Sequence, residues 1–150
     1  MAKFIYRMQN ILDLKERLET QAKTEFSEAS AKVALEEEKM RELILRKEEY
    51  EAQKLEKLSG KVEFVEVRHL TDAIRAMKDL MDKQALAIRV AERERDKARL
   101  KLNDAIQERK VQEKLKENAF EEFKLEVNAS EIKEIDQLVS FTYNDKKKKE

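Results

Sequence analysis

Very few side chains in this sequence have the type and spacing that catalysis or metal binding requires. The single histidine, His69, has no cysteine with which to build a zinc or thiol site, because the chain contains no Cys. Phosphate-binding loops of the G-x-x-x-x-G-K-[ST] and G-x-G-x-x-G types need at least two glycines, and this chain has only Gly60. Carboxylates are abundant, but acid–base catalysis needs a cleft that desolvates one of a pair. We therefore expect no enzyme activity, no catalytic residue, no metal and no cofactor, and we interpret His69 as a seam or surface residue.

The composition is that of long helices rather than of a compact domain. Charged residues make up 44% of the 150 positions and hydrophobic residues 41%, with one Gly and no Pro. Compact domains need turns, and turns draw on Gly, Pro, Asn and Asp. A chain rich in Ala, Glu, Lys, Leu and Arg with so little turn chemistry is typical of a coiled coil.

Charge and hydropathy argue against several classes of partner. The 33 basic and 33 acidic residues cancel, so no overall field recruits nucleic acid or an acidic membrane. The most basic stretch, residues 89–116, is diluted by six acidic residues and has no aromatic side chain on which a base could stack. No segment approaches the roughly 20 apolar residues of a membrane span, and no apolar run of signal-peptide length opens the chain. We expect a cytoplasmic protein without nucleic-acid binding or membrane insertion.

The apolar spacing predicts an all-α fold, a long antiparallel two-helix coiled-coil hairpin whose second helix is longer than the first. The predicted elements are a helix over about 3–58, a turn at 59–61, a second helix over about 62–143 and a basic tail at 144–150. In the second helix, steps of three and four residues predict one continuous seam. Its members are Ile74, Met77, Met81, Gln84, Ile88, Ala91, Arg95, Ala98, Leu102 and Ala105. The polar members, Gln84 and Arg95, are expected to fix the register.

The hairpin turn is placed at Gly60, because glycine adopts positive φ without steric cost just past a helix end. The alternative is an isolated glycine inside one uninterrupted helix, with two chains pairing as a structural dimer. The hairpin predicts a monomer, and the dimer predicts a particle of twice the mass.

A reversal at Gly60 would bring Phe4 near Lys116 and leave the chain beyond about Glu117 without a partner of its own. This overhang keeps large apolar residues at helical spacing: Phe120, Phe123, Leu125, Val127, Ile132, Ile135, Leu138, Val139 and Phe141. Such a stripe favours a docking surface, and fraying or folding back onto the coil is the alternative. Residues 117–136 contain seven acidic and two basic side chains, a like-charge block that can steer a partner or simply form a solvated face.

The two ends of the chain resemble the FliJ family of flagellar export proteins. The opening, residues 3–16, has the family's aromatic residue, Arg, apolar residue, Gln and apolar pair before charged residues, in Phe4-Ile5-Tyr6-Arg7-Met8-Gln9-Asn10-Ile11-Leu12. Residues 131–138, Glu-Ile-Lys-Glu-Ile-Asp-Gln-Leu, are similar to its acidic C-terminal motif. The length, the hairpin position and the basic final residues also fit.

The resemblance implies a non-enzymatic coupling and adaptor protein of the flagellar type III export apparatus. The family binds the FliI export ATPase ring and the cytoplasmic domain of the FlhA export gate, and it assists export chaperones. It implies a place in motility and chemotaxis, peripheral at the inner face of the cell membrane at the flagellar base. The implied ring-binding residues are Phe4, Tyr6, Met8, Ile11, Phe120, Phe123, Ile132 and Ile135.

The implied gate-binding residues are Leu43, Tyr50, Ile74, Met77 and Leu80. The chain departs from the family here, since it has Arg46 and Ala73 where aromatic residues are usual. Core packing is the alternative role for Leu43, Ile74 and Met77. Other interpretations of the whole chain are a stalk-like subunit of a virulence-type secretion system or rotary ATPase, and the structural dimer.

Overall fold

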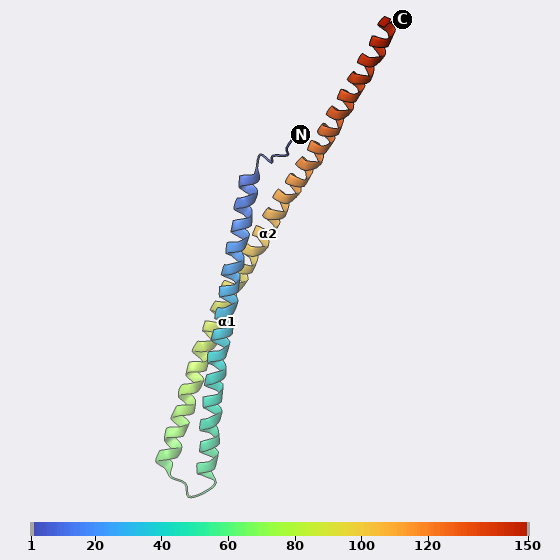
Figure 1. The fold of residues 1–150 in the computed structure, drawn as a ribbon. Helices are drawn as coiled ribbons and strands as arrows, with labels where there is room; N and C mark the ends of the chain where they lie inside the picture. Colours follow the sequence, from blue (N-terminus) through green and yellow to red (C-terminus); the bar gives the residue numbers. More distant parts are fainter. Residues whose placement is uncertain (1, 150) are drawn as a thin grey trace. The chain divides into compact units, whose positions relative to one another are not determined.

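The computed structural model describes residues 2–149, with side chains described for residues 2–142. Its elements are α1 (Gln9–Leu58) and α2 (Phe64–Lys149), and the described residues contain no strand (Figure 1). The predicted all-α fold of two helices, the second longer than the first, is confirmed: α1 has 50 residues and α2 has 86. The chain reverses between them, so the alternative of one uninterrupted helix per chain is wrong.

The chain divides into two compact units, each built from one segment of each helix. The turn unit is Thr20–Asp104, and the terminal unit combines Met1–Glu19 with Ala105–Glu150. In both units the paired segments run antiparallel, as cross-helix contacts show. Lys57 pairs with Glu66 and Glu25 with Lys101 in the turn unit, while Lys15 pairs with Glu108 in the terminal unit.

The seam of the turn unit follows the predicted alternation. Ile74 and Ala91 are buried, and the other predicted seam residues within the unit are half-buried. From α1 the buried apolar residues are the small side chains of Ala22 and Val33. The predicted α2 seam is confirmed, and it is narrow because each helix contributes only one stripe of side chains.

The start of α1 lies later than the apolar pattern indicated. Residues 2–6 have no regular structure, residues 7–8 form a turn, and the helix begins at Gln9 rather than at about Lys3. No Ser, Thr, Asp or Asn precedes residue 9 to cap an earlier start. Phe, Ile and Tyr in this stretch are weaker helix formers than Ala, so packing can hold them in another conformation.

The turn is longer than predicted, and its glycine does not have the predicted backbone conformation. Residues 59–63 connect the helices, and α2 begins at Phe64 rather than near Val62. The amide and hydroxyl groups of Ser59 donate to the carbonyl oxygen of Glu56, at 3.2 and 2.8 Å, which closes the end of α1. Gly60 does not adopt positive φ, so the expected left-handed cap is absent at this position. The Lys57–Glu66 ion pair, at 3.0 Å, links the two helix ends across the turn.

The helix register in the terminal unit is shifted from the expected one. Phe4 contacts Phe120 and Phe123, about one helical turn beyond the predicted neighbour Lys116. The longer connection moves the point of reversal toward α2. The non-helical residues 2–6 also span more distance per residue than a helix does. At the other end the backbone of α2 stays helical through Lys149, and the side chains of the predicted basic tail lie outside the described residues.

We predict that Gly60→Ala stabilises the protein. A Cβ atom at this position would have no neighbour within 4 Å, and φ is already in the range that alanine adopts. The alanine restricts the unfolded chain, so the free energy of unfolding should rise by about 0.4–1 kcal/mol. Urea denaturation followed by circular dichroism measures the change. A loss of stability would show that this turn needs glycine in a conformation different from the one described.

Candidate functional site

An aromatic cluster joins the chain's first residues to α2 in the terminal unit. The ring of Phe4 lies with its centroid 5.1 Å from that of Phe120, in an edge-on arrangement, and 5.4 Å from that of Phe123. The ammonium of Lys124 lies 4.6 Å from the centre of the Phe120 ring, within cation–π range. Three of the predicted ring-binding residues are therefore brought together, by packing that holds residues 2–6 against α2.

This finding corrects the sequence-based view of Phe120 and Phe123 as unpartnered residues. Both have Phe4 as a partner within the chain, and every described side chain of α2 from Asn128 on is exposed. Of the other predicted ring-binding residues, Tyr6 is half-buried, with its hydroxyl 3.5 Å from Oε1 of Gln112. Met8 and Ile11 are exposed beside it, and the neighbouring core position on α1 is taken by Leu12.

A shallow groove of about 490 Å³ opens beside the aromatic cluster. Its walls combine apolar side chains with charged ones from both helix segments: Phe4, Leu12, Glu16, Glu113, Lys116, Glu117 and Phe120. Arg109 of α2 contacts the buried carboxylate of Glu19 and bonds to the groove residue Glu113 at 2.8 Å. The carboxylates of Glu113 and Glu19 raise the pKa of Arg109. Glu113, which lines the groove, is thus linked to a charged contact across the seam.

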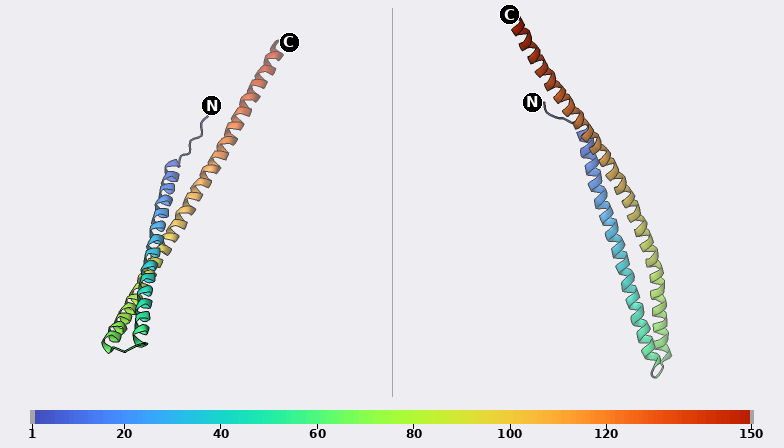
Figure 2. Two further views of the ribbon diagram at one scale, coloured as in Figure 1. Left: turned by 60° about the horizontal axis from the view of Figure 1, so that its bottom comes forward. Right: turned by 90° about the vertical axis from the view of Figure 1, so that its right-hand side faces the viewer.

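Beyond the cluster, α2 continues without a partner in the described chain. Figures 1 and 2 show this stretch of the terminal unit running on past the start of α1. Its large apolar residues are more than half exposed: Leu125, Ile132, Ile135, Leu138, Val139 and Phe141. Ile132 and Ile135, predicted for ring binding, belong to this stretch and make no contact with the Phe4 cluster. The terminal unit therefore offers a mixed aromatic groove and a separate exposed helix.

The structure distributes the predicted gate-binding residues over different environments in the turn unit. Leu43 and Leu80 line one groove of about 350 Å³, together with Lys39, Glu42, Arg46, Lys83 and Gln84. Tyr50 and Met77 are half-buried and lie outside that lining. Ile74 is only 8% exposed, so core packing accounts for it. The sequence analysis did not predict that Lys39, Arg46 and Lys83 surround the apolar floor formed by Leu43 and Leu80.

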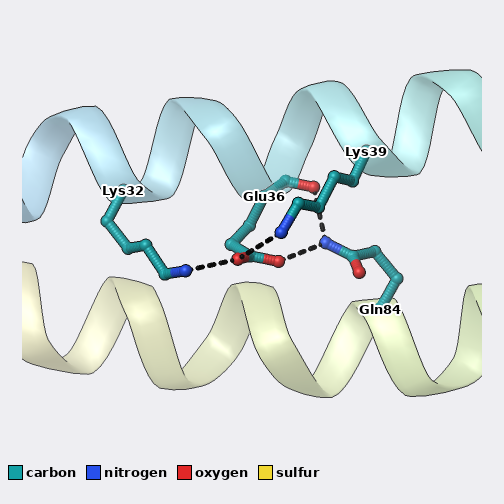
Figure 3. A network of polar contacts seen from close by, with 4 residues as sticks. All are labelled: Lys32, Glu36, Lys39 and Gln84. Atoms are coloured by element: carbon teal, nitrogen blue, oxygen red, sulfur yellow. Dashed lines mark hydrogen bonds and ion pairs between the residues drawn. The ribbon is translucent and has the colours of Figure 1, made fainter.

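The same groove is bounded by a buried polar contact across the seam (Figure 3). The side-chain amide of Gln84 donates to the backbone carbonyl of Glu36 at 2.8 Å and to its carboxylate at 2.6 Å. Glu36 is only 5% exposed, and its carboxylate also pairs with Lys32 at 2.8 Å and with Lys39 at 3.3 Å. The lysines come from the same helix, one turn before and one turn after Glu36.

These contacts strongly lower the pKa of Glu36. Hydrogen bonds from Lys32 first, and then from Gln84, lower its pKa from 4.5 to about 2, against the opposing effect of burial. Sequence reasoning identified Gln84 as a polar seam residue but missed Glu36 as its partner. The flanking lysines at i−4 and i+3 were the available signal, because they can neutralise an acid that faces a partner helix.

Neither groove has the features of a reaction centre. Both are open surface depressions, and within the described residues no group of three or more His, Cys, Asp or Glu side chains is placed to hold a metal ion. His69 is exposed near the start of α2. Over the described residues, neither helix carries an apolar stretch long enough to cross a membrane. The arrangement is suited to binding other macromolecules through helix faces.

Comparison with known protein families gives one match that covers nearly the whole chain. The model of the family described as flagellar FliJ protein matches residues 4–148. Comparisons with curated proteins and with solved structures gave no match. The family match spans both units, so it includes the aromatic cluster, the exposed end of α2 and the groove of the turn unit.

We predict that Glu36 makes the stability of the turn unit depend on pH in the acid range. Because its pKa is lowered in the folded state, its ionised form stabilises the fold above pH 4.5, and this contribution disappears as the pH falls toward about 2. Glu36→Gln should therefore lower the melting temperature by a few degrees at neutral pH and flatten its decrease below pH 4.5. Thermal melts at a series of pH values measure both effects.

The matched control for this prediction is Glu38→Gln. Glu38 is exposed and pairs only with Arg41 of the same helix among the described contacts, at 2.7 Å. The charge change is the same, but the seam is untouched. If the two variants gave the same melting profile across this pH range, the cross-seam role of Glu36 would be wrong.

Proposed function

The chain belongs to the flagellar FliJ protein family, a non-catalytic component of flagellar export, and from this premise we propose that it couples and adapts parts of the export apparatus. The terminal unit docks on the FliI export ATPase ring, and the turn unit docks on the cytoplasmic domain of the FlhA export gate. The same surfaces serve export chaperones. In this proposal the protein works as a monomer at the inner face of the cell membrane, at the flagellar base.

The exposed end of α2 carries the first part of the proposal. Residues of the size of Leu, Ile and Phe are seldom left more than half exposed in a row along a helix unless another molecule covers them. Here such residues continue for the length of α2 from Leu125 to Phe141. The Phe4 cluster adds aromatic side chains next to this end, and aromatic residues are enriched among those that dominate binding energy.

The groove at Leu43 and Leu80 supports the second part. It combines an apolar floor with charged walls, the usual make-up of an interface core with a polar rim. Its position between α1 and α2 allows a partner to contact both helices at once. The half-buried Met77 and Tyr50 can extend such a contact along the turn unit.

Loss of the aromatic cluster should weaken binding to the ATPase. For Phe120→Ala plus Phe123→Ala we expect an affinity for hexameric FliI lower by on the order of tenfold, because two aromatic anchors are removed. The helix content should change little, since neither residue is buried in a wide core. Co-purification and surface plasmon resonance with the ATPase of the same flagellar system measure the affinity, and circular dichroism measures the helicity.

Two further variants of the protein make this test specific. Val111→Ala removes an exposed apolar side chain from the same unit, and binding should be unchanged. Deletion of residues 125–150 removes the exposed end and should abolish binding. ATPase binding that survives this deletion at full strength would contradict the ring-docking part of the proposal.

Loss of the apolar floor in the turn unit should affect the gate and spare the ATPase. Leu43→Ala plus Leu80→Ala should reduce the affinity for the FlhA cytoplasmic domain by several-fold or more while leaving FliI binding intact. The control is Leu35→Ala plus Leu86→Ala, which removes equally large exposed leucines from the same unit outside this groove. Equal effects of both pairs on FlhA binding would argue against a gate contact at this groove.

A further inference from the structure

The unpartnered end of α2 carries a second apolar face that points away from α1. From residue 109 on, the half-buried side chains of α2 mark the side that faces α1 and residues 2–6: Arg109, Gln112, Lys116, Ala119, Phe123 and Val127. At about 100° per residue, Leu125, Ile132, Ile135 and Val139 lie roughly 150° around the helix from that side. Packing against α1 therefore does not explain this second group.

The second group has the spacing of a coiled-coil seam. Steps of seven, three and four residues separate Leu125, Ile132, Ile135 and Val139, which is the alternation that presents one stripe to a partner helix. Their exposed fractions are 69%, 58%, 58% and 63%. Branched aliphatic residues repeated in this way are the side chains that insert between those of a facing helix.

The same side of α2 is polar where α2 pairs with α1. Moving back along the helix, the positions nearest the line of the stripe are Glu121, Lys114 and Lys110, all exposed, and the exposed Val111 lies at its edge. The outer face thus changes from mainly charged to mainly aliphatic beyond the residues of α2 that pair with the start of α1. If the outer face served only solubility, it would stay charged along its whole length.

The charges beside the stripe indicate the chemistry of its partner. Glu131 and Asp136 flank it at the positions that form ion pairs between helices in coiled coils. Within residues 2–142 no ion pair of either carboxylate is seen. Lys124, the basic residue on this border, is held by Glu121 at 3.4 Å and lies over the Phe120 ring. The whole block from 117 to 136 has seven acidic and two basic residues.

A second copy of this chain fits the stripe poorly. Antiparallel pairing of two such stripes would bring Glu131 and Asp136 of one chain against the same acidic residues of the other. Like charges facing each other across a seam are destabilising. A helix with the same aliphatic spacing but basic flanks satisfies both the apolar stripe and its acidic borders.

We propose that Leu125, Ile132, Ile135 and Val139 bind one amphipathic helix of a partner protein in coiled-coil fashion, and that Lys or Arg residues flank the apolar stripe of that helix. The proposal rests on the proposed function in one respect, that this end of α2 docks on another protein. It specifies the face and the chemistry of the contact, which ring docking leaves open. Because the stripe covers only about two heptads, the contact is reversible.

A synthetic helical peptide of about four heptads tests the chemistry directly, with Ile and Leu at the seam positions and Lys at the flanking ones. The lysines keep the free peptide from pairing with itself. Titration of the full-length protein into fluorescently labelled peptide should show saturable binding by anisotropy. A matched peptide with Glu at the flanking positions should bind at least about tenfold more weakly.

Paired variants of the protein assign the contact to the stripe. Ile132→Gln plus Ile135→Gln should weaken binding of the basic peptide by at least about tenfold. Glutamine is a good helix former, so α2 should stay helical in this variant. Phe141→Gln changes an exposed apolar residue on the other side of the helix and should leave peptide binding nearly unchanged. Glu131→Lys plus Asp136→Lys should reverse the preference toward the acidic peptide, whereas Glu126→Lys plus Glu134→Lys, on the other side of the helix, should not.

Equal binding of the two peptides, or an unchanged affinity after the Ile132 and Ile135 substitutions, would overturn this inference. The FliI co-purification separates its failure from failure of the proposed function. If deletion of residues 125–150 abolishes ATPase binding but the basic peptide does not bind, the proposal for the stripe alone is wrong. If the peptide binds as described and the deletion leaves ATPase binding intact, the ring-docking proposal alone is wrong.

Discussion

Pairing of two helices along a single narrow seam is the constraint on which the rest of the molecule depends. Each helix contributes one stripe, and much of the buried apolar surface comes from small residues such as Ala22 and Ala91. Such a seam buries little area per residue, so sliding by one helical turn would cost little if the seam were wholly apolar. The polar contact of Gln84 with Glu36 removes this freedom, because any other register would leave a buried carboxylate without its amide donor.

The terminal unit uses a different device for the same purpose. There the seam is held by Arg109 between Glu19 and Glu113, by Lys15 with Glu108, and by the ring of Phe4 on Phe120 and Phe123. All of these charged side chains except Glu19 are partly exposed, so their individual contributions are small. The aromatic contact matters more, because it takes residues 2–6 out of a helix and uses them to cover the α2 face. The two units therefore share one architecture but fix its register in different ways.

Unequal helix length leaves part of α2 without a partner in the described chain. The 50 residues of α1 cannot cover the 86 residues of α2, so α2 keeps its helical form beyond the last residue that α1 can pair with. A helix in that position is stable only if its own side chains or a partner support it. Its aliphatic stripe and acidic borders are then available for another molecule, while the groove in the turn unit offers cationic walls. The two surfaces differ in charge, and the proposed discrimination between two partners depends on this difference.

The sequence by itself determined the helical fold, the single reversal near residue 60, the α2 seam from Ile74 to Ala105 and the family. These follow from local periodicity and from end motifs, which need no knowledge of what packs against what. Only the tertiary structure decided the register, the start of α1 at Gln9, the partnership of Phe4 with Phe120 and Phe123, and the pairing of Gln84 with Glu36. The length of the turn and side-chain contacts far apart in the chain set these features. A repeating pattern is nearly unchanged by a shift of one heptad, so it cannot choose among neighbouring registers.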